Sequence, residues 1–171
     1  GEHIGLMYEE KHTFVNKTKN MQEKQDFVPA LPGGCRLYTF STTTDERGTL
    51  SFLENSPRLP FRIMRTFWIY NVPEGQERGT HAHRTCQEIL IPVHGSFRVE
   101  ISDGSHTADL LMDRPEQGLF VPEMVWCRLH SFTPGAVCLC MASQKYDKRG
   151  YINNYDDYKK ERLDADRQLR P

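Results

Sequence analysis

The chain has 171 residues and a mass of 19.9 kDa, a length typical of one domain with a sizeable buried core. Hydrophobic residues make up 37% and charged residues 26%, a globular composition that excludes wholesale disorder. The 22 basic and 23 acidic residues nearly balance, so we expect no nucleic-acid or membrane partner. No run of 18 apolar residues is present, so we expect no transmembrane helix.

The first 34 residues are polar, carry little periodicity and end in Pro32-Gly33-Gly34. We expect them to form an N-terminal arm with at most one short strand. They do not have the pattern of a secretory signal peptide.

Predicted strands follow one another from Cys35 to Ala142, with turn signals at spacings of about 8–12 residues. Residues Thr42–Gly48 are predicted to be a turn, and Asp103-Gly104 is typical of a hairpin turn. Residues 155–170 are charged with scattered Tyr and Leu, which predicts a helix. The predicted strands, in chain order, are 35–40, 49–53, 64–72, 87–93, 96–101, 107–111, 118–121, 125–129 and 136–142. The pattern indicates an all-β sandwich or barrel.

The cysteines are odd in number and form no CxxC pair: Cys35, Cys86, Cys127, Cys138 and Cys140. We therefore expect reduced, mostly buried thiols and a cytoplasmic protein. Cys138 and Cys140 are two residues apart in an apolar run, so on a strand they share a face.

The densest motif is Gly75-x5-His81-Ala82-His83-x4-Glu88-x6-Gly95. Two histidines at i and i+2 of a strand point to the same face, and Glu88 returns to that face across a turn. Polar groups that converge inside a small barrel are costly to bury without a task. The motif resembles the first motif of the cupin superfamily. That resemblance implies a single cupin jelly roll, a double-stranded β-helix with a short C-terminal helix.

The second cupin motif is matched in part. Residues 118–122 (GLFVP) supply its strand and proline, but Met124 and Cys127 stand where metal-binding cupins have a glycine and a histidine. In such cupins that histidine completes a set of imidazole and carboxylate ligands that suits Fe, Mn, Ni or Zn. We therefore expect no metal in this protein.

Longer strings narrow the resemblance. They include Asp45-x-Arg47-Gly48-x-Leu50, Arg78-Gly79-Thr80-His81-Ala82-His83-Arg84, Pro122-x3-Trp126, Ala142-Ser143-x2-Tyr146-Asp147 and Tyr151-Ile152-x2-Tyr155-Asp156. Together they resemble the sugar-nucleotide 3,4-ketoisomerases, from Cys35 to about Tyr158. The resemblance implies three parts: an arm over 1–34, a cupin domain over 35–158, and a helix or tail over 159–171. It also implies a homodimer, with exchange of N-terminal strands in some members.

The same resemblance implies a cofactor-free isomerase that moves the keto group of a dTDP-4-keto-6-deoxyhexose from C4 to C3 through an enediol or enediolate. Histidine suits such proton transfer at neutral pH. By similarity, His81 is the main base and His83 its partner. The predicted substrate-binding residues are Arg78, Arg47, Arg65, Glu88, Tyr70 and Trp126. Arg78 is the first candidate for binding the diphosphate, followed by Arg47 and Arg65. Tyr70 and Trp126 are expected at the sugar or the base.

Four positions depart from the family pattern. Gly150 and Asn153 replace an expected Asp and Arg, Cys127 stands where His or Arg is common, and Trp68 is assigned to an aromatic position that is often Tyr. These departures leave the sugar open.

Three other functions remain open. A sugar-nucleotide epimerase of the same fold would invert stereocentres and leave the carbonyl at C4. A metal cupin would use His81, His83 and Glu88 as ligands. A non-catalytic module would bind a sugar nucleotide without turnover.

Overall fold

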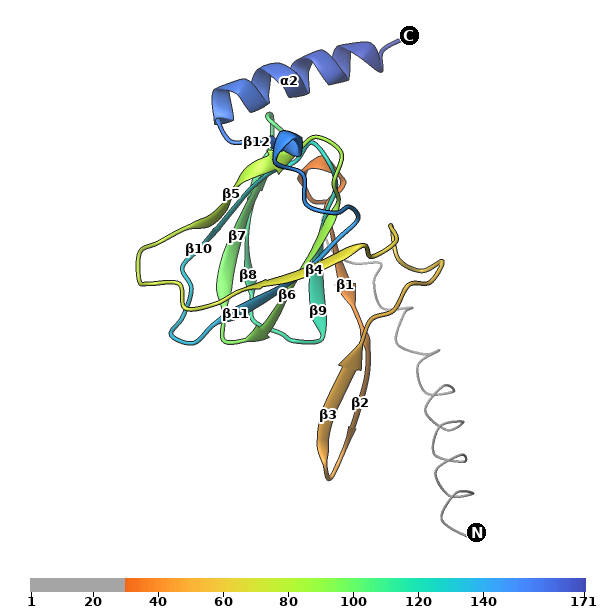
Figure 1. Ribbon diagram of the computed structural model, residues 1–171, viewed down its shortest axis with the longest axis vertical. Coiled ribbons are helices and arrows are strands. Elements are labelled where there is room, and N and C mark those ends of the chain that lie inside the picture. Colours follow the sequence, from red (N-terminus) through yellow and green to blue (C-terminus); the bar gives the residue numbers. More distant parts are fainter. Residues whose placement is uncertain (1–29) are drawn as a thin grey trace.

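The computed structural model describes residues 30–171, which form two facing sheets with a hairpin and a helix attached (Figure 1). Of the predicted arm, only residues 30–34 are described, and Pro32–Gly34 form a 3-10 turn. The short strand that the arm was given falls outside the described residues. The strands are β1 (Arg36–Thr39), β2 (Ser41–Asp45), β3 (Gly48–Phe52), β4 (Arg65–Ile69), β5 (Arg78–His83), β6 (Glu88–His94), β7 (Phe97–Ser102), β8 (Thr107–Met112), β9 (Gln117–Val121), β10 (Trp126–His130), β11 (Val137–Ala142) and β12 (Tyr151–Ile152).

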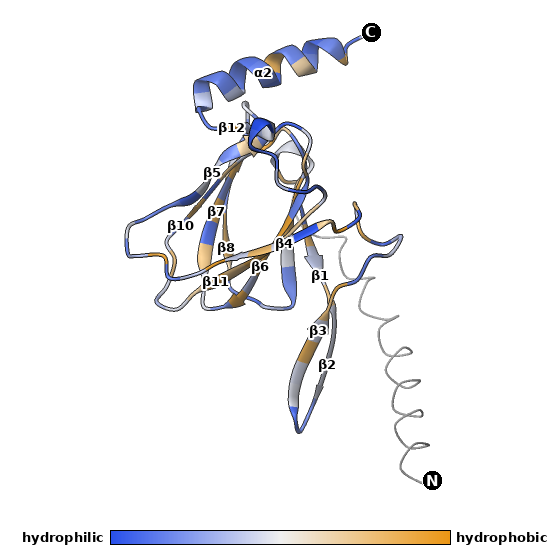
Figure 2. Cartoon of the chain, in the orientation of Figure 1, coloured by the Kyte–Doolittle hydropathy of each residue, from blue (hydrophilic) through white to orange (hydrophobic). Residues whose placement is uncertain are grey.

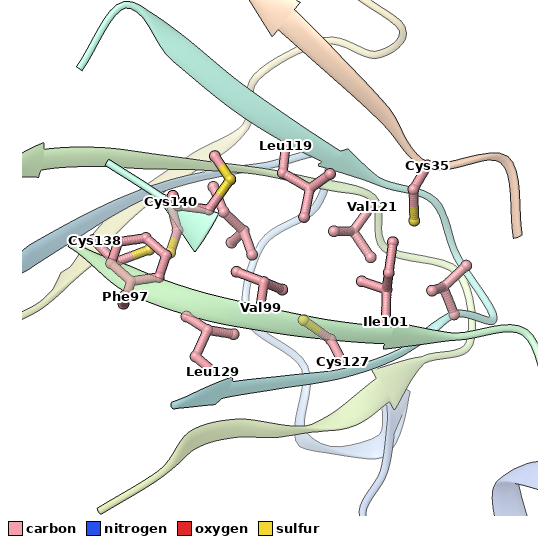
Figure 3. Close-up of a cluster of buried hydrophobic side chains, with 13 residues drawn as sticks. Cys35, Phe97, Val99, Ile101, Leu119, Val121, Cys127, Leu129, Cys138 and Cys140 are labelled. Atoms are coloured by element: carbon pink, nitrogen blue, oxygen red, sulfur yellow. The ribbon is translucent and has the colours of Figure 1, made fainter. Parts of the chain in front are cut away.

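One sheet has the order β1-β9-β6-β11-β4 and the other β12-β5-β10-β7-β8. The paired strands are antiparallel throughout, and alternate side chains point between the sheets. Figure 3 shows the resulting core, in which Phe97, Val99 and Ile101 of β7 face Leu119 and nearby residues. The predicted all-β jelly roll is confirmed.

The predicted turn at Thr42–Gly48 is wrong. Ser41–Asp45 is a strand, and it pairs with Gly48–Phe52 in a hairpin in which Asp45 lies opposite Gly48. Three consecutive threonines favour the extended chain because they are β-branched. The turn is therefore reduced to Glu46 and Arg47. This hairpin projects away from the barrel (Figure 1).

The helix α2 spans Tyr155–Gln168 and begins after Asn154, whose side chain accepts a hydrogen bond from the Asp157 backbone N–H at 3.0 Å. It lies over one end of the barrel (Figure 1) and its surface is mostly hydrophilic (Figure 2). The fully buried Tyr158 donates its hydroxyl to the carbonyls of Ser102 and Met124. These bonds fix the helix on the sheet that carries β5.

All five cysteines lie in the described part of the chain, where each is buried and unpaired. Cys138 and Cys140 share a face of β11, as predicted, with their Sγ atoms 3.6 Å apart. Within residues 30–171, no helix is both long and apolar enough to cross a membrane.

Candidate active site

A cavity of about 260 Å³ opens between the two sheets. One part of its wall is apolar and the other carries the titratable groups of the histidine motif. The cavity is lined by Phe67, Ile69, Arg78, Gly79, His81, His83, Glu88, Leu90, Val121, Val125, Cys127, Leu129, Cys140 and Tyr151. Four predicted site residues therefore meet here: Arg78, His81, His83 and Glu88.

The two histidines occupy one face of β5. Ala82, between them, points to the opposite face and is fully buried beneath α2. The rings of His81 and His83 are 4.8 Å apart between centroids and nearly perpendicular. The alternation of a strand thus delivers both imidazoles to the cavity, as the motif predicted.

Glu88 begins β6 on the facing sheet and is buried, as is His83. Its Oε1 contacts Nε2 of His83. This contact places a carboxylate directly against the imidazole of His83. His81 has no such carboxylate contact among the described residues.

The surroundings of His81 favour its neutral form. Burial, together with the neighbouring His83, lowers the pKa of His81 from 6.5 to about 4, and Glu88 opposes this change. At neutral pH, the His81 imidazole is therefore a proton acceptor.

Arg78 reaches the cavity through an irregularity in β5. Between the pairs Cys127–His81 and Leu129–Arg78, β5 has one residue more than β10, and Gly79 adopts a φ of +62°. Such a bulge redirects the neighbouring side chain. The exposed Arg78 consequently lines the cavity together with the histidines.

Arg65 is half-buried and does not line the main cavity. Its guanidinium stands 5.0 Å from the Phe67 ring centre and 5.6 Å from that of Tyr146. It shares a small adjoining cavity of about 40 Å³ with His83 and Tyr151. Its Nε is buried and has no hydrogen-bond partner within residues 30–171.

Besides Arg65, which lines only the adjoining small cavity, three predicted substrate-binding residues do not line the main cavity. Cys127 points inward from β10, so strand alternation turns Trp126 outward, where it packs on Tyr155 and Tyr158. Tyr70 follows the inward Ile69 and is 57% exposed. Arg47 lies at the tip of the β2–β3 hairpin, paired with Asp45.

Sequence reasoning gave no role to Tyr151, although its string was recognised. β12 pairs with β5 so that Tyr151 lies opposite His83. The Tyr151 ring centre is 4.8 Å from that of His81 and 4.5 Å from that of His83. A two-residue strand has no periodicity, so only the register reveals this position.

Trp68, which was given the family's aromatic position, points away from the cavity and is 59% exposed. The inward aromatic residue of β4 is Phe67. The cavity therefore has a phenyl ring at this wall, without a hydroxyl.

The donors of a metal cupin come together only in part. Ligand atoms of His81, His83 and Glu88 lie within 4.8 Å of one another. Within residues 30–171, no further histidine joins these three as a fourth ligand. The nearby Cys127 is a thiol whose pKa is raised by burial. This donor set falls short of the four-ligand cupin site, so no step below is routed through a metal.

The model of the family described as FdtA, WxcM-like, C-terminal, matches residues 33–163. The chain belongs to this family. A curated relative, TDP-4-oxo-6-deoxy-alpha-D-glucose-3,4-oxoisomerase of Aneurinibacillus thermoaerophilus, is 34% identical over 73% of this chain and 90% of its own length. The ketoisomerase resemblance of the sequence is confirmed.

Solved structures agree with the FdtA assignment. The WlaRB TDP-quinovose 3,4-ketoisomerase of Campylobacter jejuni is 33% identical, with a TM-score of 0.72 over 75% of this chain and 98% of its own. A histidine-to-asparagine mutant of QdtA, a 3,4-ketoisomerase of Thermoanaerobacterium thermosaccharolyticum, in complex with TDP-4-keto-6-deoxyglucose, is 31% identical. Its TM-score is 0.74, covering 76% of this chain and 94% of that one.

Proposed function

We propose that this protein is a sugar-nucleotide 3,4-ketoisomerase that converts dTDP-4-keto-6-deoxyglucose to a 3-keto isomer. The observation that carries the proposal is the convergence of two histidines, a carboxylate and an arginine on one cavity of a chain of this family. The reaction moves one hydrogen from C3 to C4 and one proton between the two oxygens. It needs no external oxidant.

His81 is proposed to act on carbon. It is neutral at working pH, and it lines the cavity without a carboxylate contact within residues 30–171. It would take the proton from C3 of the 4-keto sugar, giving an enediol or enediolate, and return a proton at C4.

His83 and Glu88 are proposed to act together beside the carbonyl. The Glu88 carboxylate contacts Nε2 of His83, and an imidazole beside the carbonyl can donate a hydrogen bond as negative charge develops on the enediolate oxygen. The pair thus stabilises the intermediate while His81 handles the carbon-bound proton.

Arg78 is proposed to bind the diphosphate. It is exposed and lines the same cavity as the histidines, and a guanidinium fork matches phosphate oxygens. Arg65 shares the small adjoining cavity with His83 and Tyr151, so we place it near the reacting oxygens. Arg47, Tyr70 and Trp126 are left out of the proposed site.

We also propose a homodimer formed through the outer face of the β4-containing sheet. Trp68 lies opposite Leu139 on that face, and Leu139 lies opposite Ile91. A groove of about 510 Å³ beside them is largely apolar and includes Val93, which is 40% exposed. We expect a dimer in sedimentation velocity and a monomer for Trp68→Glu; a monomeric parent would contradict the proposal. Exchange of N-terminal strands remains a prediction.

A cytoplasmic location is proposed from the five unpaired, buried thiols, because reducing compartments preserve such thiols. Thiol titration after denaturation should count all five. A count of three or fewer would contradict the proposal.

The catalytic assignment is tested with variants assayed on dTDP-4-keto-6-deoxyglucose. We expect His81→Asn and His83→Asn to lower kcat by about 10²–10⁴-fold, the usual contribution of a general acid or base. His106→Asn is the matched control, since its side chain is 80% exposed and pairs with Asp103 at 3.5 Å. Equal activity of His81→Asn and His106→Asn would contradict the role of His81.

A further inference from the structure

The isomerisation moves a proton between two oxygens as well as a hydrogen between two carbons. His81 serves the carbons in the proposed function, and the Nε2 of His83 lies against the Glu88 carboxylate. The O4 carbonyl must gain a proton and the O3 hydroxyl must lose one. A group that can both donate and accept a proton beside these oxygens is therefore required.

Tyr151 carries the one hydroxyl among the side chains that line this cavity within residues 30–171. The remaining polar lining residues are an arginine, two histidines, a carboxylate and two thiols. Burial raises the pKa of Cys127, and a hydrogen bond with Cys138 together with burial raises that of Cys140, so neither thiol is suited to accept and release protons.

The position of Tyr151 is fixed from two sides. Opposite His83 in the β5–β12 register, its ring packs against both imidazoles. Behind it, the Arg84 guanidinium donates to the backbone carbonyls of Arg149 at 2.7 Å and Tyr151 at 3.0 Å. Arg84 is itself held by both carboxylate oxygens of Glu161 in α2. The helix thus supports the strand that presents the phenol.

The positive charge of Arg65 favours proton transfer by the Tyr151 phenol. Burial raises the pKa of Tyr151, and the positively charged Arg65 opposes this increase. A guanidinium beside a phenol stabilises the phenolate that forms when the proton leaves. The unpartnered Nε of Arg65 shows that this cation has donor capacity left.

We propose that Tyr151 is a catalytic residue that shuttles the proton between O4 and O3 of the sugar; this rests on the ketoisomerase function proposed above. As His81 removes the C3 proton, the C3–H electron pair forms the C3=C4 bond. The carbonyl electrons move to O4, which takes the proton of Tyr151. The phenolate, stabilised by Arg65, then accepts the O3 proton. O3=C3 forms, and the electrons of the C3=C4 bond take a proton from His81 at C4. Both residues return to their starting states.

The test compares Tyr151→Phe with the parent in D2O and measures two rates by NMR. One is deuterium entry at C3 of recovered 4-keto sugar, and the other is appearance of 3-keto product. We expect Tyr151→Phe to lower product formation by about 10²–10³-fold. We expect C3 exchange to fall less, because His81 can still form and reprotonate the enediolate. The ratio of exchange to isomerisation should rise at least tenfold.

Tyr146→Phe is the matched control. Its ring centre is 5.8 Å from that of Tyr151, but Tyr146 is 66% exposed and does not line the cavity. It should keep the parent's ratio. Product formation by Tyr151→Phe within threefold of the parent, or an equal loss of both rates, would overturn the shuttle while leaving the proposed function intact. A parent that yields neither exchange nor product would overturn the proposed function, and the shuttle with it.

Discussion

Lowering the pH tests the electrostatic environment of His81. Burial beside His83 lowers its pKa from 6.5 to about 4. At pH 5, a histidine of pKa 6.5 is about 3% neutral, whereas one of pKa about 4 is about 90% neutral, a difference of about 30-fold in active base. We therefore expect kcat/KM to stay nearly level down to about pH 5 and to have its acid midpoint near 4.

The assay is the pH dependence of kcat/KM, paired with an NMR titration of the His81 ring in the free enzyme. His83→Asn removes one of the two causes of the low pKa, so the midpoint should move upward in that variant. A parent midpoint near 6.5 in the titration would refute the reasoning.

The same pKa difference has a consequence for stability. Below pH 6.5, the unfolded chain binds a proton at His81 that the folded chain accepts only near pH 4. The free energy of unfolding therefore decreases as the pH falls between these values, by at most about 3 kcal/mol. In His81→Asn this contribution should be absent, which urea unfolding at pH 7 and pH 5 would measure.

Three further predictions concern the barrel, the helix contact and metal. Gly118→Ala should lower the free energy of unfolding by about 1–3 kcal/mol, because the new Cβ would lie 2.5 Å from Cζ of Phe40. Gly150→Ala is the control: open space surrounds this glycine, so the free energy of unfolding should change by less than about 0.5 kcal/mol. Equal effects of the two variants in urea unfolding would contradict the packing argument. Arg84→Gln should lower kcat several-fold through loss of the bonds to the carbonyls of residues 149 and 151, with faster amide hydrogen exchange at Tyr151 as the measurement; unchanged exchange would contradict it. Dialysis against a chelator should leave kcat unchanged, whereas loss of activity restored by one divalent metal would favour the metal cupin.

Strand positions and the histidine pair were predictable because both depend on a period of two. Phe97, Val99 and Ile101 alternate in the sequence and pack together in the barrel core. His81 and His83 likewise share one face and meet in the cavity. In such segments, local pattern and tertiary burial agree.

The rest of the site depends on how the strands pair and on which of two neighbouring side chains points inward, and the sequence alone did not establish either. Trp126 was given a role at the substrate because of its chemistry, but the inward position belongs to its neighbour Cys127. On β4, likewise, Phe67 points into the cavity and Trp68 points away from it. Tyr151 became visible only through the pairing of β12 with β5. A shift of one residue changes which side chain enters a barrel.

The most direct test of the central claim is proton NMR of the metal-depleted parent with dTDP-4-keto-6-deoxyglucose in D2O. We predict a 3-keto product with deuterium at C4, whose coupling constants define the configuration at that carbon. A sugar that keeps its carbonyl at C4 with an inverted stereocentre would contradict the claim in favour of an epimerase. An unchanged substrate that nevertheless protects the protein against heat would contradict it in favour of a binding module.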